Sequence, residues 1–145
     1  MRTAYLDCFS GVSGDMLLGA LLDVGLPEAH LRAVVSALQL DGVTLEISRP
    51  VVQGFAATRA QGHVPYHDHG HHHAHRHLAE ITALLERADL EPAVRARALA
   101  VFTRLAEAEA SVHGTTPDRI HFHEVGADDA LVDIVGTVAG LAWLG

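Results

Sequence analysis

The apolar positions of the chain recur at the spacings of helices and short strands, and they predict its elements. Residues 16–25 (MLLGALLDVG) are apolar at most positions, which is typical of a buried helix, and Gly25 is placed to end it. Pro27 opens a second helix that reaches about Leu40. The apolar side chains of this helix fall on one face: Leu31, Val34, Val35 and Leu38.

Strand patterns occupy three stretches of the first half. Residues 3–8 (TAYLDC) are typical of a short buried strand. Residues 43–50 (VTLEISRP) alternate, so that Val43, Leu45 and Ile47 point one way. We expect residues 55–64 to form the partner of this second strand, with Gly54 near the turn.

Three further helices are predicted over residues 78–89, over residues 91–112, where Gly114 follows, and from about Asp128 onward. In the middle one, apolar residues repeat at three- and four-residue steps: Val94, Ala98, Val101, Leu105, Ala108 and Val112. In the last one, the residues available for packing are Leu131, Ile134, Val135, Val138 and Leu141. The pattern predicts one α/β domain over residues 1–145, with a small mixed sheet covered by helices and a flexible histidine-rich loop over residues 65–77.

Composition narrows the classes of function. The chain has 145 residues, and its 49% hydrophobic content is enough for a single core. A formal net charge of −8 and the lack of lysine argue against a nucleic-acid partner. No apolar run is long enough to span a bilayer and no basic-then-apolar leader opens the chain, so we expect a cytoplasmic protein without membrane contact. The single cysteine, Cys8, excludes an internal disulfide, and we expect it to be a small buried residue.

The histidine run HDHGHHHAHRH over residues 67–77 is the most unusual feature of the sequence. It holds seven imidazoles: His67, His69, His71, His72, His73, His75 and His77. Neutral imidazole is the commonest nitrogen ligand for zinc, nickel and copper, and Asp68 adds an oxygen donor. Our hypothesis is that the run collects a divalent metal, nickel or zinc, and passes it to a tighter site. The alternative is a solvated linker that binds metal only in the test tube.

A second cluster lies in HFHEVGADDALVD. His121 and His123 are two residues apart and face the same side of an extended segment, and Glu124 follows directly. Asp129 and Asp133 are four apart and share a helix face. These imidazoles and carboxylates would suit a borderline divalent cation. The alternative is that the acids at the start of this helix only favour its dipole.

A third candidate is the loop FSGVSGD over residues 9–15, between the first predicted strand and helix. Its glycines permit close approach to a ligand, its serines offer hydroxyls, and free helix amides suit an anion such as phosphate. The residues concerned are Ser10, Gly11, Ser13 and Gly14. Asp7 would sit at the carboxyl end of the strand, at the mouth of any crevice there. The alternative is a tight turn, with Ser13 as the N-cap and Asp15 in the first helical turn.

Three pieces of the sequence together resemble the nickel-insertion proteins of the nickel-pincer cofactor pathway, the LarC family. They are the opening YLDCFSGVSGDMLLGALLDVG, the mid-chain histidine run, and HFHEVGADDALVDIVG, and the resemblance covers nearly the whole chain. One departure is visible, because the family usually reads HEVGAVDSIVDI. Asp128 therefore replaces an apolar residue and Ala130 a serine, whereas Asp129, Asp133 and the HFHE segment match.

The resemblance implies a reaction that no motif here reveals by itself. Family members install nickel into a pyridinium dithiocarboxylate mononucleotide through nickel–carbon and nickel–sulfur bonds, and they consume CTP with Mn²⁺ or Mg²⁺. The product serves lactate racemase. The nucleotide-hydrolysing part is usually placed in the C-terminal region of longer chains. The resemblance then implies an N-terminal domain of a CTP-dependent nickel chelatase (lyase class), which captures Ni²⁺ and presents it but is incomplete alone.

On this reading the catalytic candidates are Asp7, Asp15, His123, Glu124 and Asp129. The expected metal ligands are the seven histidines of the run with His121, His123, Glu124, Asp129 and Asp133. The expected partners are the pyridinium mononucleotide, a C-terminal half in the same or a separate chain, and a second copy in a homo-oligomer.

The sequence is also compatible with three other functions. A non-catalytic nickel or zinc store, or a metallochaperone, would bind metal without affinity for a pyridinium nucleotide. A metal-dependent hydrolase would need a tight stoichiometric metal with an open coordination position, and little in the sequence supplies its nucleophile. A structural domain would assemble a larger protein through the last helix, whose apolar end carries Trp143 and Leu144.

Overall fold

A computed structural model describes residues 3–64, 76–122 and 125–145. Within these ranges the helices are α1 (Gly14–Asp23), α2 (Glu28–Ala37), α3 (Leu78–Arg87), α4 (Pro92–His113) and α5 (Asp128–Leu144), with a short 3-10 turn at Pro117–Arg119. Short strands accompany them, so the predicted α/β class is confirmed.

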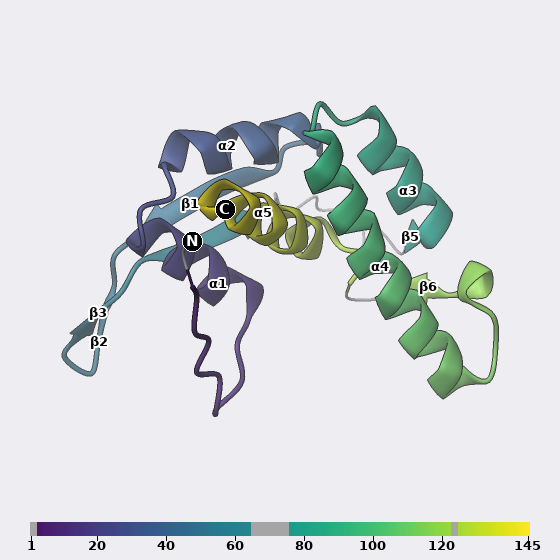
Figure 1. Cartoon of the computed structure of the whole chain (residues 1–145), viewed down its shortest axis with the longest axis horizontal. Coiled ribbons are helices and arrows are strands. Elements are labelled where there is room, and N and C mark those ends of the chain that lie inside the picture. The colour runs from purple at the N-terminus through teal and green to yellow at the C-terminus, as the bar shows by residue number, and fades with distance from the viewer. Residues whose placement is uncertain (1–2, 65–75, 123–124) are drawn as a thin grey trace.

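Helix α5 lies at the centre of the fold (Figure 1). It contacts α1, α2, α4 and strand β4 (Arg59–His63), and its inner positions are small enough to allow this close packing. A Cβ at Gly136 would lie 2.9 Å from Leu18 Cδ2, and one at Gly140 would lie 2.8 Å from Leu21 Cδ1. Glycine at these two positions therefore lets α1 approach the central helix.

Strand β1 (Thr44–Ser48) and β4 form an antiparallel ladder, in which Leu45 faces Gly62 and Ile47 faces Ala60. The ribbon continues into β2 (Val51–Val52) and β3 (Phe55–Ala56), joined at Gln53 and Gly54. Both of these residues have positive φ, 52° and 86°, as a two-residue type I′ hairpin turn requires. The predicted strand over residues 43–50 and the turn at Gly54 are confirmed, and the predicted partner strand over residues 55–64 is divided between β3 and β4.

A third ladder joins distant parts of the sequence. Strand β5 (Arg76–His77) pairs antiparallel with β6 (His121–Phe122). The described strands thus form three separate two-stranded ladders rather than one mixed sheet.

Most predicted helices are confirmed. All four apolar residues predicted on one face of α2 are buried. Helix α1 ends with Gly25 at φ 107°, where the N–H of Leu26 donates to Leu21 O at 3.0 Å, and Gly114 ends α4 at φ 62°. Among the residues that the structure describes, none of the helices combines the length and hydropathy that a bilayer crossing needs.

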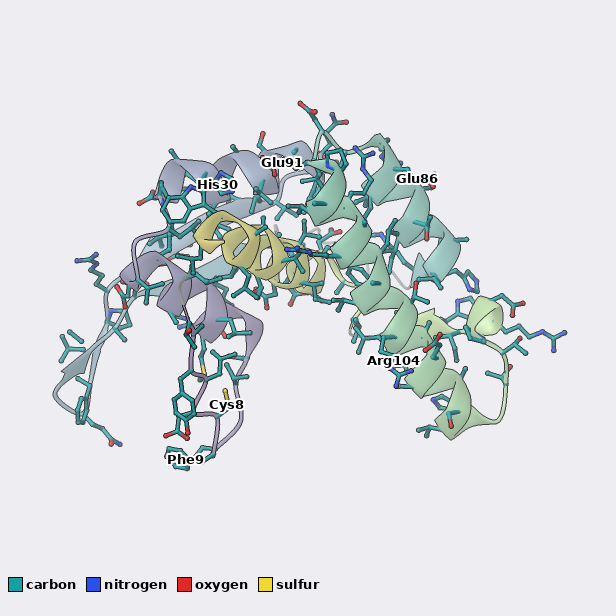
Figure 2. All side chains as sticks on the ribbon, in the orientation of Figure 1. Cys8, Phe9, His30, Glu86, Glu91 and Arg104 are labelled. Atoms are coloured by element: carbon teal, nitrogen blue, oxygen red, sulfur yellow. The ribbon has the colours of Figure 1, made fainter. Side chains whose placement is uncertain are left out.

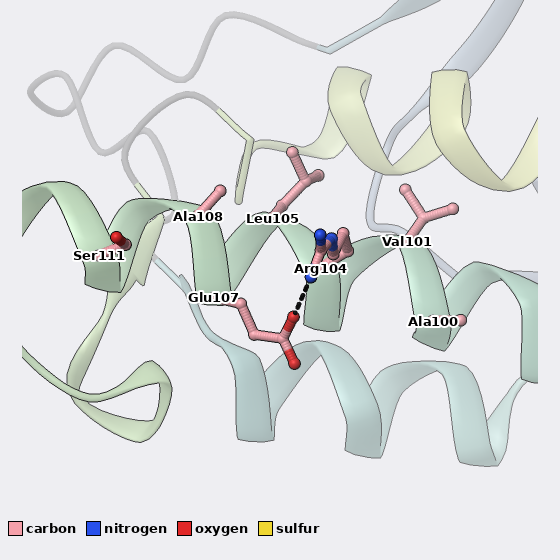
Figure 3. A pocket seen from close by; sticks show the side chains of 7 residues that line it. All are labelled: Ala100, Val101, Arg104, Leu105, Glu107, Ala108 and Ser111. Carbon is pink, nitrogen blue, oxygen red and sulfur yellow. Dashed lines mark hydrogen bonds and ion pairs between the residues drawn. The ribbon is translucent and has the colours of Figure 1, made fainter.

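The predicted apolar face of α4 is wrong beyond its second turn. The buried residues follow a four-residue step: Val94, Ala98, Phe102, Ala106 and Ala110. Val101 is 38% exposed because it lies about 100° around the helix from Phe102, and Val112 is 83% exposed because it lies about 200° around the helix from Ala110. Figure 3 shows Val101, Leu105 and Ala108 instead lining an open cavity, beside an Arg104–Glu107 ion pair of 3.0 Å.

The predicted buried strand over residues 3–8 is also wrong. The segment forms no strand, and Tyr5 is 87% exposed, Leu6 63% and Phe9 91%. Cys8 is exposed rather than buried. The physical reason is that no strand in the described ranges pairs with this segment, so no ladder of hydrogen bonds orders its backbone.

Candidate functional site

The loop before α1 turns sharply and brings the start of this helix to α5. The N–H of Gly11 donates to Cys8 O at 3.0 Å, and Gly11 has a φ of 87°. Ser13 is the N-cap, as the tight-turn alternative predicts. Its hydroxyl donates to the Asp15 carboxylate instead of accepting a backbone N–H. The first-turn amides of α1 are therefore not capped by Ser13.

Gly14 packs directly on Asp133 of α5. A Cβ at position 14 would overlap the Asp133 side chain. Glycine is needed here so that α1 and α5 can meet, whether or not a ligand approaches the loop. The contact also joins two regions that the sequence analysis treats separately, the FSGVSGD loop and the acids of the last helix.

Three carboxylates lie near one another where these helices meet. Burial raises the pKa of Asp133 to about 6, and the negative charges of Asp15 and Asp129 add to the shift. A cation is nearby, since Arg59 Nε lies 3.6 Å from Asp15 Oδ2. Such a group of acids attracts cations, and a phosphate would sit here only with a cation between it and the carboxylates.

The histidine run ends beside the HFHE segment. The β5–β6 ladder places His77 opposite His121, and their ring centroids lie 3.6 Å apart. His77 Nδ1 lies 3.0 Å from Ile120 O. A carbonyl oxygen only accepts, so in the tautomer that forms this hydrogen bond Nδ1 carries the proton and Nε2 keeps its lone pair. Two of the predicted nitrogen ligands are thus brought together.

Arg76 is the residue at this site that sequence reasoning missed. Its Nη2 lies 2.6 Å from Asp128 Oδ1, and its Nη1 donates to Gly126 O at 2.7 Å. The Arg76 and Asp128 side chains are only 18% and 19% exposed. The ion pair ties the end of the histidine run to the start of α5. Two signals were visible in the sequence: the lone arginine within the run, and the acid at Asp128 where the resembling family has an apolar residue.

The other predicted site residues are not all brought to one place. Asp7, Ser10 and Gly11 lie in the exposed segment before α1. His67, His69, His71, His72, His73, His75, His123 and Glu124 lie outside the described residues. Among the residues that are described, no three His, Cys, Asp or Glu side chains are placed to hold one metal ion. The described part therefore holds pairs of donors rather than a closed metal site.

An apolar cavity of 470 Å³ opens beside Asp133. It lies between the start of α1, the middle of α4 and one side of α5. Its walls include Val12, Leu17, Leu105 and Ile134, and Asp133 is its one acidic lining residue within the described ranges. A cavity of this volume, apolar with one charged group, is typical of a small-molecule site.

Comparison with known protein families matches residues 4–145 to the family described as "Nickel insertion protein". Relatives from Gloeobacter violaceus, Desulfitobacterium hafniense and Roseiflexus castenholzii are 52%, 50% and 54% identical to the chain. The matches cover 99%, 100% and 99% of the chain but only 34%, 35% and 35% of the relatives, so the chain spans about a third of their length. The Desulfitobacterium relative is named pyridinium-3,5-bisthiocarboxylic acid mononucleotide nickel insertion protein. No solved structure matches the chain.

Proposed function

The chain belongs to the nickel insertion protein family, and from this premise we propose that it captures Ni²⁺ and delivers it to pyridinium-3,5-bisthiocarboxylic acid mononucleotide. The observation that carries the proposal is the family match over residues 4–145, at about half identity to a relative whose name states this substrate. Nickel is the cargo in this scheme, so its ligands must release it as well as bind it.

The β5–β6 ladder, in which His77 lies opposite His121, supports capture of nickel. His77 and His121 supply two imidazole nitrogens from different strands, already close together before metal arrives. In the proposal the remaining ligands come from His67, His69, His71, His72, His73, His75, His123 and Glu124. Imidazole and carboxylate donors of a borderline cation favour uptake with ready exchange, which suits transfer to the sulfur and carbon ligands of the product.

The cavity beside Asp133 supports binding of the organic acceptor. A pyridinium ring is a planar cation with apolar faces, and the 470 Å³ cavity has apolar walls and one carboxylate. In this arrangement Asp133 would face the ring charge, and Asp15 and Asp129 would hold the incoming cation next to it. The proposal also assigns catalytic roles to Asp7, His123 and Glu124, and the mononucleotide phosphate to Ser10, Gly11, Ser13 and Gly14.

The CTP-dependent step belongs to the region of the family polypeptide outside this chain. This assignment is supported by the family resemblance, which places the nucleotide-hydrolysing part in the C-terminal region, and by the length of the relatives, of which this chain spans about a third. The lyase class, maturation of lactate racemase and a cytoplasmic location are parts of the same proposal, as are a homo-oligomer and a C-terminal partner region.

Nickel titration tests the capture step. His121→Ala removes an exposed ligand, and we expect it to lower nickel affinity, as deletion of residues 67–77 should lower the number of ions bound. His30→Ala is the matched control, because Figure 2 shows His30 on α2, a helix outside the β5–β6 ladder. Equal titrations for all four proteins would reject the proposed ligands.

Reconstitution tests delivery. The chain is mixed with the remaining region of a relative, nickel, CTP and the dithiolated precursor, and activation of lactate racemase is measured. Omitting the chain should abolish activation. A chain that binds nickel but neither the pyridinium nucleotide nor the assay partners would instead be a metal store, which the two neighbouring imidazoles of His77 and His121 would also serve.

A further inference from the structure

The first described residues have a strand sequence without a strand partner. Residues 3–8 (TAYLDC) have the composition of a buried strand, yet they enter no ladder with any strand that the structure describes. Tyr5 and Leu6 are 87% and 63% exposed. Figure 2 shows Cys8 and Phe9 at the far end of this loop, away from the helices. Both the backbone edge and its apolar side chains are open to a partner.

The end of α5 presents a second uncovered surface next to this segment. A cavity of 730 Å³ lies between Thr3 and Ala4 on one side and the last turn of α5 on the other. Leu141 and Trp143 line it, and they are 45% and 42% exposed. Tryptophan buries a large area when it is covered, so a partner that filled this cavity would gain much of its contact there.

The relatives of this chain are long enough to include such a partner. The relatives that match the whole chain are about three times longer, so roughly two thirds of the family polypeptide lies outside the matched part. In these relatives the matched third belongs to the same polypeptide as this remaining region, which is long enough to supply both a strand and a covering surface.

We propose that residues 3–8 become a β-strand by pairing with a strand of this remaining region, which also covers Leu141 and Trp143. Strand addition satisfies the open backbone edge, and alternate side chains then pack on the end of α5. The inference goes beyond the proposed function, since neither nickel nor nucleotide takes part in it. If the strand-addition proposal were wrong, the proposed capture of nickel would not be affected.

Hydrogen exchange provides the first test. Amide exchange is followed by mass spectrometry in this chain and in the full-length Desulfitobacterium hafniense relative, without metal. We expect amides aligned with residues 4–8 to exchange about 100-fold more slowly in the full-length protein, because ladder amides open rarely. Equally fast exchange in both overturns the proposal. Protection in this chain alone that grows with its concentration would assign the edge to a second copy, and would overturn it as well.

Proline substitution provides the second test. Tyr5→Pro and Leu6→Pro each remove one N–H, and adjacent N–H groups of a strand point to opposite edges, so one of the two must lie on the paired edge. We expect that variant to bind the purified remaining region about 10-fold more weakly, with no change in the thermal midpoint of the isolated chain. Phe55→Ala, an exposed aromatic on β3, is the control and should bind normally. Unchanged binding by both proline variants contradicts strand addition.

Discussion

At the scale of single residues, Asp133 shows how position sets chemistry. Its carboxyl is partly buried against α1 and faces the charges of Asp15 and Asp129, so its pKa is raised to about 6. The folded state therefore holds this proton more tightly than the unfolded chain, whose pKa is 3.8. As pH falls from 6 toward 4, protonation of Asp133 raises the free energy of unfolding. Above pH 6 the ionised carboxylate destabilises the folded state.

Replacing Asp133 by asparagine should therefore stabilise the metal-free protein at pH 7.5, with little effect at pH 4. The measurement is the urea midpoint of wild type and Asp133→Asn at both pH values. Glu46→Gln, an exposed change on β1, controls for loss of an acid. A gain of the same size at both pH values would show that charge burial is not the cause.

The contribution of Asp23 to stability depends on pH in the opposite direction from that of Asp133. Thr58 donates to it from Oγ1 at 2.6 Å and from its N–H at 3.1 Å, and these bonds, led by the hydroxyl, lower the pKa of Asp23 below 3.8. The stability that they provide is complete above this value and is lost as pH falls below it. Thr58→Val should lower the urea midpoint at pH 7, and the deficit should shrink toward pH 2.5. Thr44→Val on β1 is the control, and its midpoint should not follow pH in this way.

At the scale of elements, close packing depends on what each glycine faces. A Cβ at Gly19 would overlap the backbone carbonyl of Thr58, which cannot move without distorting β4. A Cβ at Gly136 meets Leu18 and Leu31 side chains at 2.9 and 3.0 Å, and these can change rotamer. We expect Gly19→Ala to cost about 1–3 kcal/mol. Gly136→Ala should cost less than about 1 kcal/mol, because alanine also favours the helix. Equal losses in chemical denaturation would contradict this distinction.

The elements also show what a sequence can and cannot predict. The face of α2 was predictable because its large apolar residues stand in one stripe. In α4, alanines occur on several sides, so two stripes fit the sequence, and only the packing of Phe102 against Phe122 of β6 decides between them. The predicted strand over residues 3–8 is wrong for another reason, because a strand forms only when a second strand supplies its hydrogen bonds. That second strand is no part of the local pattern.

The site was predictable in its residue types but not in its arrangement. Histidine and carboxylate content indicates cation chemistry at once. The contact between Gly14 and Asp133, and that between His77 and His121, join residues far apart in the chain, and no local pattern encodes them. A larger residue at position 14 would disrupt the packing of α1 on α5, so a loss of ligand binding in such a variant would not identify the loop as the binding site.

At the scale of the whole molecule, the Arg76–Asp128 ion pair connects the end of the histidine run to the central helix. The pair is mostly buried, and Gly126 O adds a second bond to Arg76. Asp128→Val restores the residue usual in the resembling family but leaves the guanidinium without its partner. We expect a loss of about 2–3 kcal/mol, somewhat less than the ~3–5 kcal/mol of a fully buried broken pair, because both side chains keep some solvent.

The double variant Arg76→Leu/Asp128→Val separates the stability of this pair from its role in positioning His77. Two apolar residues can fill the same space, so its stability should return to within about 1 kcal/mol of wild type. Nickel affinity should stay reduced, since β5 then lacks the bonds that fix His77 beside His121. Denaturation and nickel titration of wild type, Asp128→Val and the double variant measure both quantities. If affinity recovered together with stability, Arg76 would act on the fold alone, and the ladder backbone would suffice to hold the two imidazoles in place.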